Sequence, residues 1–247
     1  MRIVCLCAAL CAAHSCPVSP CKVLCLHGGG ESKEHFESSL APFRTVANDV
    51  ELVFVEAPYP NALWILDAPG GKGAGTDDSA WDALSTGLIR DVVESQGPFY
   101  GILGFSQGTA ALISYLSMHG DDFEVVMAFS AYLPSTHRGI NGRVLQGKPY
   151  HHRSFIYSGT HDTVIHDSLT EEYAGLFDPD KQVRVVAVGA GHRMPAGGSC
   201  AMSQAGIFLN SPATQGSRIS CSSAANTAPV PLMAAFCSAL ILLLFFT

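Results

Sequence analysis

Short apolar runs alternate along this chain with longer stretches in which apolar residues recur at helical spacing. The runs are rich in Val, Ile, Leu and Phe, which is typical of strands buried on both faces of a parallel sheet. Helices are predicted at residues 79–95 and 109–116, and long loops at 61–78 and 135–152. Strands are predicted at residues 22–26, 50–55, 100–103, 123–130, 154–157 and 183–188. This alternation predicts an α/β fold, a doubly wound, mostly parallel sheet flanked by helices.

A Gly-x-Ser-x-Gly motif lies at residues 104–108, between the predicted strand at 100–103 and the predicted helix at 109–116. A serine on such a tight strand-to-helix turn projects its hydroxyl away from the sheet. Glycines tolerate the backbone crowding on either side of it. Ser106 is therefore the predicted nucleophile.

Two later strands run into residues that complement a nucleophilic serine. Asp162 follows the strand at 154–157, and His192 follows the strand at 183–188. The order Ser, Asp, His is that of an α/β-hydrolase fold, and ligands of open parallel sheets bind at the carboxyl ends of the strands. We expect Asp162 to be the acid and His192 the base. Asp167, in the same segment as Asp162, is the second candidate for the acid.

Backbone amides near the motif are candidates for an oxyanion hole. The first predicted strand ends in a histidine and three glycines at residues 27–30. A glycine turn can aim N–H groups at a developing negative charge without obstruction by side chains. We assign the oxyanion hole to the amides of Gly29 and Gln107.

Apolar residues on the predicted loops are candidates for the substrate pocket. They are equally compatible with ordinary packing in the core. The candidates are Trp64, Tyr132, Leu133 and Met194.

Composition narrows the choice of function. The 247 residues are 48% hydrophobic and 14% charged, which suits one domain with a buried sheet. The formal net charge of −7, without a basic patch, argues against a nucleic-acid partner. Histidines at 151, 152, 161 and 166 match no zinc-binding spacing, so neither a metal nor another cofactor is expected.

Several blocks of the sequence resemble the family of serine hydrolases (FSH), α/β-hydrolases that include the ovarian-cancer-associated esterases. The blocks are residues 22–28, 56–58, 97–108 and 155–157 with Asp162, together with Gly191, His192 and Pro195. The likeness covers residues 22–210, which we take as the hydrolase domain. It implies that Ser106, Asp162 and His192 are nucleophile, acid and base of a carboxylic-ester hydrolase.

The two ends of the chain lie outside this likeness. Residues 1–15 have the charged start, apolar core and small residues of a signal peptide, although they also fit an upstream extension of a cytoplasmic enzyme. Residues 211–231 are predicted to be a linker. Residues 232–247 are apolar, and a helix of that length spans roughly 22 Å, short of a ~30 Å hydrocarbon core. This tail predicts a glycolipid (GPI) anchor signal, or a tail anchor, on a membrane protein of the secretory pathway.

The nine cysteines leave the compartment open. Cys25 belongs to a predicted buried strand. Four others would form two disulfides in an oxidising lumen, but free thiols fit equally well. These four are Cys16, Cys21, Cys200 and Cys221.

Together these observations predict a serine esterase that cleaves small-molecule esters with small or medium hydrophobic groups through an acyl-enzyme. Two alternatives remain at this point: a thioesterase, and an inactive hydrolase fold that serves as a binding protein at a membrane surface. The sequence does not predict the oligomeric state.

Overall fold

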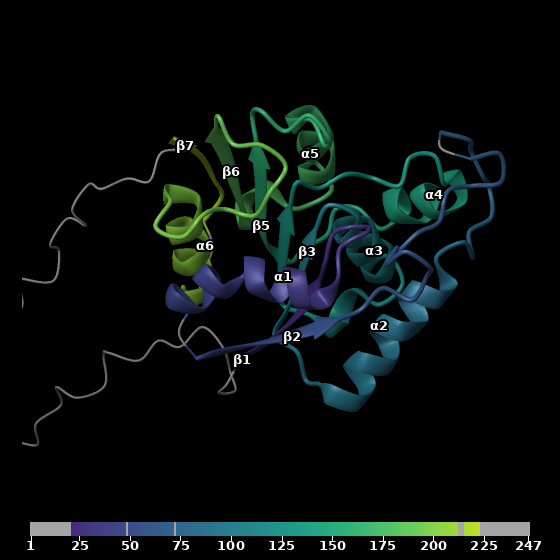
Figure 1. The fold of residues 1–247 in the computed structure, drawn as a ribbon, viewed down its shortest axis with the longest axis horizontal. Coiled ribbons are helices and arrows are strands. Elements are labelled where there is room, and N and C mark those ends of the chain that lie inside the picture. Colours follow the sequence, from purple (N-terminus) through teal and green to yellow (C-terminus); the bar gives the residue numbers. More distant parts are fainter. Residues whose placement is uncertain (1–20, 48, 72, 212–214, 223–247) are drawn as a thin grey trace, which may run out of the picture.

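The computed structural model describes residues 21–47, 49–71, 73–211 and 215–222 (Figure 1). Seven strands alternate with six α-helices and three short 3₁₀ helices in this part of the chain. The elements are β1 Cys21–Leu26, α1 Lys33–Ser39, η1 Ala41–Thr45, β2 Val50–Val55, α2 Ala83–Gln96, β3 Gly101–Phe105, α3 Gln107–Leu116, η2 Gly120–Asp122, β4 Val125–Phe129, α4 Arg138–Gln146, β5 Arg153–Gly159, α5 Asp167–Ala174, η3 Pro179–Lys181, β6 Gln182–Val188, α6 Cys200–Asn210 and β7 Ser217–Ser222.

The strands form one sheet in the order β2-β1-β3-β4-β5-β6-β7, and each neighbouring pair is parallel. The first described strand, β1, is therefore second from one edge of the sheet; the chain moves outward to the edge strand β2 and then returns past β1 toward the other edge. The carboxyl ends of β3, β5 and β6 lie along the same edge of the sheet, because all strands point the same way. The doubly wound parallel sheet predicted from the sequence is confirmed.

Helices cover both faces of the sheet, and alternate residues of a strand pack into separate cores. In β1, Leu24 and Leu26 face a core shared with α2, α3, α4 and α5. Val23 and Cys25 face the other core, which is shared with α1, η1 and α6. Each fully buried aliphatic side chain of this kind contributes about 1.5–3 kcal/mol of transfer free energy. The two cores hold the strand ends, and the loops that follow them, in fixed positions.

One predicted loop contains a helix. We expected residues 135–152 to be a long insertion without regular structure, whereas α4 occupies its centre. Two glycines in α4 weaken its intrinsic helix propensity. Burial of Ile140 and Val144, one helical turn apart, against the core compensates for this loss.

The predicted linker at 211–231 is wrong for residues 217–222, which form the edge strand β7. The segment is short and serine-rich, so its apolar pattern is weak. Ile219 packs against the core and Cys221 is buried in it. A disulfide between Cys200 and Cys221 joins β7 to the first residue of α6.

The other described cysteines differ in state. Cys21 is also disulfide-bonded, and Cys16 lies outside the described residues. Cys25 is a free, buried thiol whose pKa is raised by burial. Two of the four cysteines expected in disulfides are therefore paired with each other.

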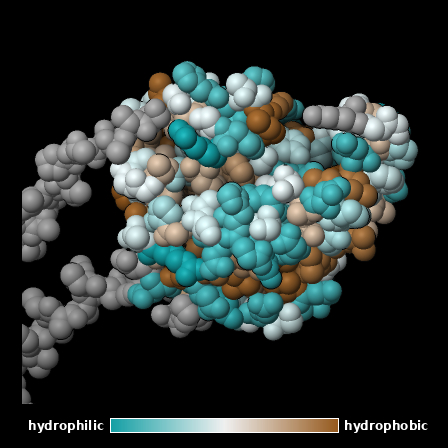
Figure 2. Space-filling model, viewed as in Figure 1, coloured by the Kyte–Doolittle hydropathy of each residue, from teal (hydrophilic) through white to brown (hydrophobic). Residues whose placement is uncertain are grey.

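Hydrophobic residues reach the surface in separate places, between hydrophilic ones, on the face shown in Figure 2. Within the described ranges, none of the helices is long and apolar enough to cross a bilayer. The predicted leader at 1–15 and the apolar tail at 232–247 lie outside those ranges.

Candidate active site

Ser106 lies on a sharp turn between β3 and α3. Its φ of 50° and ψ of −118° are strained for a residue with a side chain, and its N–H donates to the Phe129 carbonyl at 3.0 Å. A Cβ at Gly104 would lie 2.9 Å from the Gly108 backbone, and one at Gly108 would lie 2.3 Å from the Leu26 carbonyl oxygen. Both flanking positions therefore require glycine, which explains the motif physically.

Three side chains from the ends of three strands form one chain of hydrogen bonds. His192 Nδ1 lies 2.8 Å from Asp162 Oδ2, and His192 Nε2 lies 3.0 Å from Ser106 Oγ. A carboxylate can only accept, so Nδ1 carries the proton and Nε2 is free to accept from the serine hydroxyl. The three residues predicted as nucleophile, acid and base are thus brought together in the order that their chemistry requires.

The Asp162 carboxylate is enclosed and well supplied with donors. Burial by itself favours the neutral acid, but hydrogen bonds outweigh burial and lower the pKa of Asp162. His192 donates to Oδ2 at 2.8 Å, while the amides of Val164 and Ile165 donate to Oδ1 at 3.0 and 2.8 Å. The carboxylate is therefore ionised at neutral pH and fixes the orientation of the imidazole.

Asp167, the second candidate for the acid, has different partners. Its Oδ1 accepts hydrogen bonds from Ser158 and from the guanidinium of Arg184. Arg184 is buried and also lies 3.4 Å from a carboxylate oxygen of Glu171. Asp167 thus compensates a buried charge beneath α5 and takes no part in the hydrogen-bond chain of His192.

The two amides predicted for the oxyanion hole lie on adjoining segments. A Cβ at Gly29 would come within 2.8 Å of Gln107 Oε1, so the two residues are in close contact. Gln107 is the first residue of α3, where N–H groups have no acceptor within the helix. Its side chain accepts from Trp64 N–H at 2.7 Å and donates to the Ile65 carbonyl at 2.9 Å.

His27 holds the glycine turn in place, a role that the sequence did not suggest. Its Nδ1 donates to the Gly28 carbonyl at 2.7 Å, and its Nε2 accepts from Ala57 N–H at 3.0 Å. Glu31 accepts from the Gly28 amide at 3.1 Å. The turn that presents Gly29 is therefore fixed on both sides by buried or partly buried hydrogen bonds.

A cavity of about 570 Å³ opens beside Ser106. Glu31, His35 and Arg193 in its wall were not predicted from the sequence. Glu31 follows the glycine turn and His35 lies in the first turns of α1, so their closeness in sequence to residues 27–30 was the available signal. Its lining consists of Gly28, Gly29, Gly30, Glu31, Ser32, His35, Ser39, Phe105, Ser106, His192, Arg193 and Met194.

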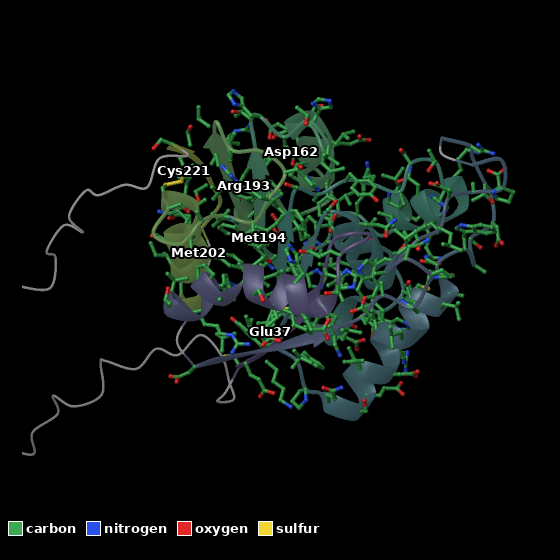
Figure 3. The ribbon with its side chains drawn as sticks, viewed as in Figure 1. Glu37, Asp162, Arg193, Met194, Met202 and Cys221 are labelled. Carbon is green, nitrogen blue, oxygen red and sulfur yellow. A yellow bond between two sulfur atoms is a disulfide. The ribbon has the colours of Figure 1, made fainter. Side chains whose placement is uncertain are left out.

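The predicted substrate-binding residues fall in three places. Met194 lines the cavity of Ser106, and Figure 3 shows it beside Arg193 on the loop that follows β6. Tyr132 and Leu133 line a separate cavity of about 310 Å³, which Gln107 also lines. Trp64 is fully buried and donates from Nε1 to the His27 carbonyl at 2.9 Å, so of its two predicted roles the structure shows packing in the core and not a place in the substrate pocket.

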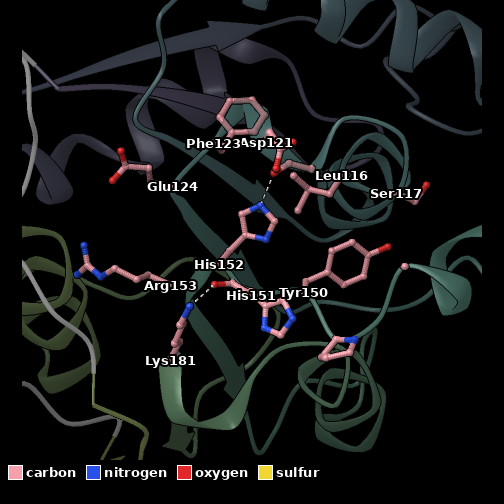
Figure 4. A pocket seen from close by; sticks show the side chains of 13 residues that line it. Leu116, Ser117, Asp121, Phe123, Glu124, Tyr150, His151, His152, Arg153 and Lys181 are labelled. Carbon is pink, nitrogen blue, oxygen red and sulfur yellow. Dashed lines mark hydrogen bonds between the residues drawn. The ribbon is translucent and has the colours of Figure 1, made fainter.

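A larger cavity, of about 770 Å³, lies near the amino ends of β4 and β5 (Figure 4). His151 and His152 line it, and they bind Asp178 and the Gly120 carbonyl respectively. The other two histidines that were considered as zinc ligands and found to lack a zinc-binding spacing, at positions 161 and 166, are exposed. In the part of the chain that the structure describes, no group of three or more His, Cys, Asp or Glu residues could hold a metal ion.

Comparison with known proteins identifies the family of this chain. The model of the family described as Serine hydrolase (FSH1) matches residues 17–65 and 75–203, which is more than half of the chain. Esterase AGAP003155 of Anopheles gambiae is 31% identical over 202 residues, covering 71% of this chain and 72% of that protein. Esterase CG5412 of Drosophila melanogaster is 28% identical over 196 residues, covering 71% and 68%. Esterase OVCA2 of Homo sapiens is 28% identical over 197 residues, covering 64% and 83%.

Solved structures show the same fold at lower identity. Zea mays acyl-protein thioesterase 2 superposes with a TM-score of 0.58 at 15% identity, covering 77% of this chain and 93% of that one. Esterase PE8 gives a TM-score of 0.57 at 19% identity, covering 78% and 92%. The α/β-hydrolase fold and the hydrolase class predicted from the sequence are thereby confirmed. With its family match and its relatives named esterases, the chain belongs to the serine hydrolase (FSH1) family, among the carboxylic-ester hydrolases.

Proposed function

We propose that this chain hydrolyses carboxylic esters with Ser106 as nucleophile, His192 as base and Asp162 as the acid that orients the imidazole. The observation that carries the proposal is the unbroken hydrogen-bond chain from Asp162 through His192 to the Ser106 hydroxyl. A serine hydroxyl is a weak nucleophile until a neighbouring base removes its proton. Here the base is in contact and already has the required tautomer.

The proposed reaction has two halves. Ser106 Oγ attacks the ester carbonyl while His192 Nε2 takes its proton, and the amides of Gly29 and Gln107 donate to the new oxyanion. The tetrahedral intermediate then collapses, and the protonated imidazole gives its proton to the departing alcohol. Water next attacks the acyl-enzyme with His192 as base, which releases the acid and restores Ser106.

The substrates that we propose are esters with small or medium hydrophobic groups. Phe105 and Met194 supply apolar surface beside Ser106, and the Phe105 ring lies 4.9 Å from the His192 ring, centroid to centroid. Tyr132 and Leu133 line the second cavity next to Gln107. A wall of this kind favours apolar acyl or alkyl groups but does not exclude polar ones.

We also propose that the protein enters the secretory pathway, where residues 232–247 act as a signal that is exchanged for a glycolipid, and that this glycolipid holds the protein at a membrane. The disulfides at Cys21 and between Cys200 and Cys221 support an oxidising compartment. Intact-mass measurement of the protein purified from its natural membrane tests this proposal. Loss of both termini, with a glycolipid on the new carboxyl end, is the expected result, and a full-length mass would contradict the glycolipid anchor.

The proposed activity is tested with a fluorophosphonate probe and a series of esters and thioesters. We expect the folded protein to be labelled and Ser106→Ala to remain unlabelled, with ester hydrolysis abolished in parallel. Equal labelling of the two proteins would refute the role of Ser106. Faster turnover of thioesters than of matched oxygen esters would show that the thioesterase alternative is the better description.

A further inference from the structure

Arg193 lines the cavity beside the proposed nucleophile. It lies on the loop after β6, beside Met194 (Figure 3). It follows His192 directly, it is exposed, and Ser106 lines the same cavity. The hydrolysis mechanism proposed above does not use it. An arginine in contact with the space beside the nucleophile therefore needs a separate explanation.

The pairing of the arginines sets this residue apart. Within the described residues, Arg193 has neither an ion pair nor a hydrogen-bond acceptor for its guanidinium, whereas every other arginine there donates to a carboxylate or a backbone carbonyl. The paired arginines are Arg44, Arg90, Arg138, Arg143, Arg153, Arg184 and Arg218.

The carboxylate in the cavity wall is already engaged and does not neutralise Arg193. Glu31 accepts from the Gly28 amide through Oε2 at 3.1 Å, and its Oε1 lies 3.4 Å from His35 Nε2. Glu31 is therefore tied to the glycine turn and to α1. Arg193 in the cavity lining is therefore left with an unpaired guanidinium, whose planar fork matches the two oxygens of a carboxylate.

We propose that Arg193 selects ester substrates that carry a free carboxylate a few bonds from the scissile ester, which it binds while the ester carbonyl lies at Ser106. This proposal rests on the proposed esterase function and names a substrate class for the same cavity. The contact increases the affinity of the anionic substrate and has no part in proton transfer. It therefore acts on the preference between esters and leaves the rate with a neutral ester unchanged.

Matched pairs of esters test the proposal. The para-nitrophenyl monoester of adipic acid is compared with para-nitrophenyl hexanoate, which places the carboxylate on the acyl side. A second pair, para-carboxyphenyl butyrate and para-acetylphenyl butyrate, places it on the alcohol side. In at least one pair, we expect Arg193→Ala to lower kcat/KM for the carboxylate ester by roughly tenfold, chiefly through KM, and to change the neutral ester less than about twofold.

Two further proteins and a change of salt sharpen the result. Arg193→Lys keeps the charge without the fork, so part of the preference should remain. Arg90→Ala removes an exposed arginine of α2 that pairs with Glu94, outside the cavity lining, and should change neither ester. Raising the ionic strength should reduce the preference of the wild type and leave Arg193→Ala unaffected.

The outcomes separate this proposal from the proposed function. If Arg193→Ala alters both members of each pair equally, or neither, carboxylate selection by Arg193 is refuted while esterase activity stands. If no ester is turned over, calorimetric binding of adipic acid monoanilide and of hexanoic anilide decides the question. Weaker binding of the monoanilide alone in Arg193→Ala supports the selection, and equal binding by the two proteins refutes it.

Discussion

The cavity beside Ser106 and the cavity beside His152 lie at opposite ends of the strands, and the larger one is remote from the proposed chemistry. Their volumes are about 570 and 770 Å³. Each contains a partly buried histidine, but the partners differ. His192 connects a carboxylate to a hydroxyl, whereas His152 Nε2 donates to the Gly120 carbonyl at 2.6 Å and its Nδ1 is buried without a partner.

This difference shows that the hydrogen-bond partners of a histidine, and not the size of the cavity beside it, indicate whether the histidine can act in catalysis. Burial lowers the pKa of His152, so its ring is neutral and serves as a spacer between η2 and β5. At the carboxyl ends of the strands, by contrast, loops from β3, β5 and β6 bring a nucleophile, an acid and a base to one point. Parallel strands make such convergence possible at that edge.

The largest expected effect follows from removing the nucleophile or the base. Ser106→Ala and His192→Ala should each lower kcat for ester hydrolysis by at least about ten-thousand-fold, because the attacking oxygen or its proton acceptor is lost. Steady-state kinetics with para-nitrophenyl butyrate measure the effect, and circular dichroism confirms the fold. Residual activity above a tenth of the wild type in either variant would contradict the assignment.

Replacing Asp162 by asparagine should lower kcat by about a thousand- to ten-thousand-fold, because the amide cannot hold the productive tautomer of His192.

The same variant also tests a prediction about the pH dependence of stability. The folded state lowers the pKa of Asp162, so the carboxylate stabilises the protein above its ordinary pKa of about 3.9, and this stability is lost as the pH falls through the lowered value.

Thermal unfolding at several pH values tests whether the stabilisation by Asp162 is lost at low pH. The difference in Tm between wild type and Asp162→Asn should stay constant from about pH 6 to about pH 5 and should shrink as the pH falls below about 4. Asp167→Asn is the matched control for activity, since Asp167 binds Arg184 and Ser158 and does not contact His192. A larger loss of kcat in Asp167→Asn than in Asp162→Asn would reverse the choice of acid.

Gln107→Ala should lower kcat by roughly ten- to a hundred-fold. The backbone amide remains, but the side-chain bonds to Trp64 and Ile65 that hold this residue are lost. A reduced kcat with little change in KM is the expected signature of a misplaced oxyanion donor. If KM alone rises, Gln107 contributes to substrate binding instead.

The smallest effect on catalysis is expected at the other cavity. His152→Ala should change kcat/KM less than about twofold, and should cost about 1 kcal/mol of stability through loss of the bond to Gly120. Ester kinetics and urea unfolding measure the two quantities. Loss of activity in a folded His152→Ala protein would contradict the view that only the cavity beside Ser106 takes part in catalysis.

The sequence by itself predicted the strands β1 to β6 in chain order, the helices α2 and α3, and the three proposed catalytic residues. Their signals are local: an apolar run predicts each strand, and a short motif or strand end predicts each residue. The crowding at Gly104 and Gly108 explains why the motif around Ser106 can be recognised without a structure. Local steric demands of this kind leave a clear mark on the sequence.

The tertiary structure alone decided which distant groups meet. It separated Asp162 from Asp167, buried Trp64 in the core and brought Arg193 to the cavity of Ser106. It also ordered α4 and β7, whose own patterns are weak, by packing Ile140 and Cys221 against the two cores. Contacts across tens of residues depend on how the sheet and helices pack, and packing is not encoded in any one segment.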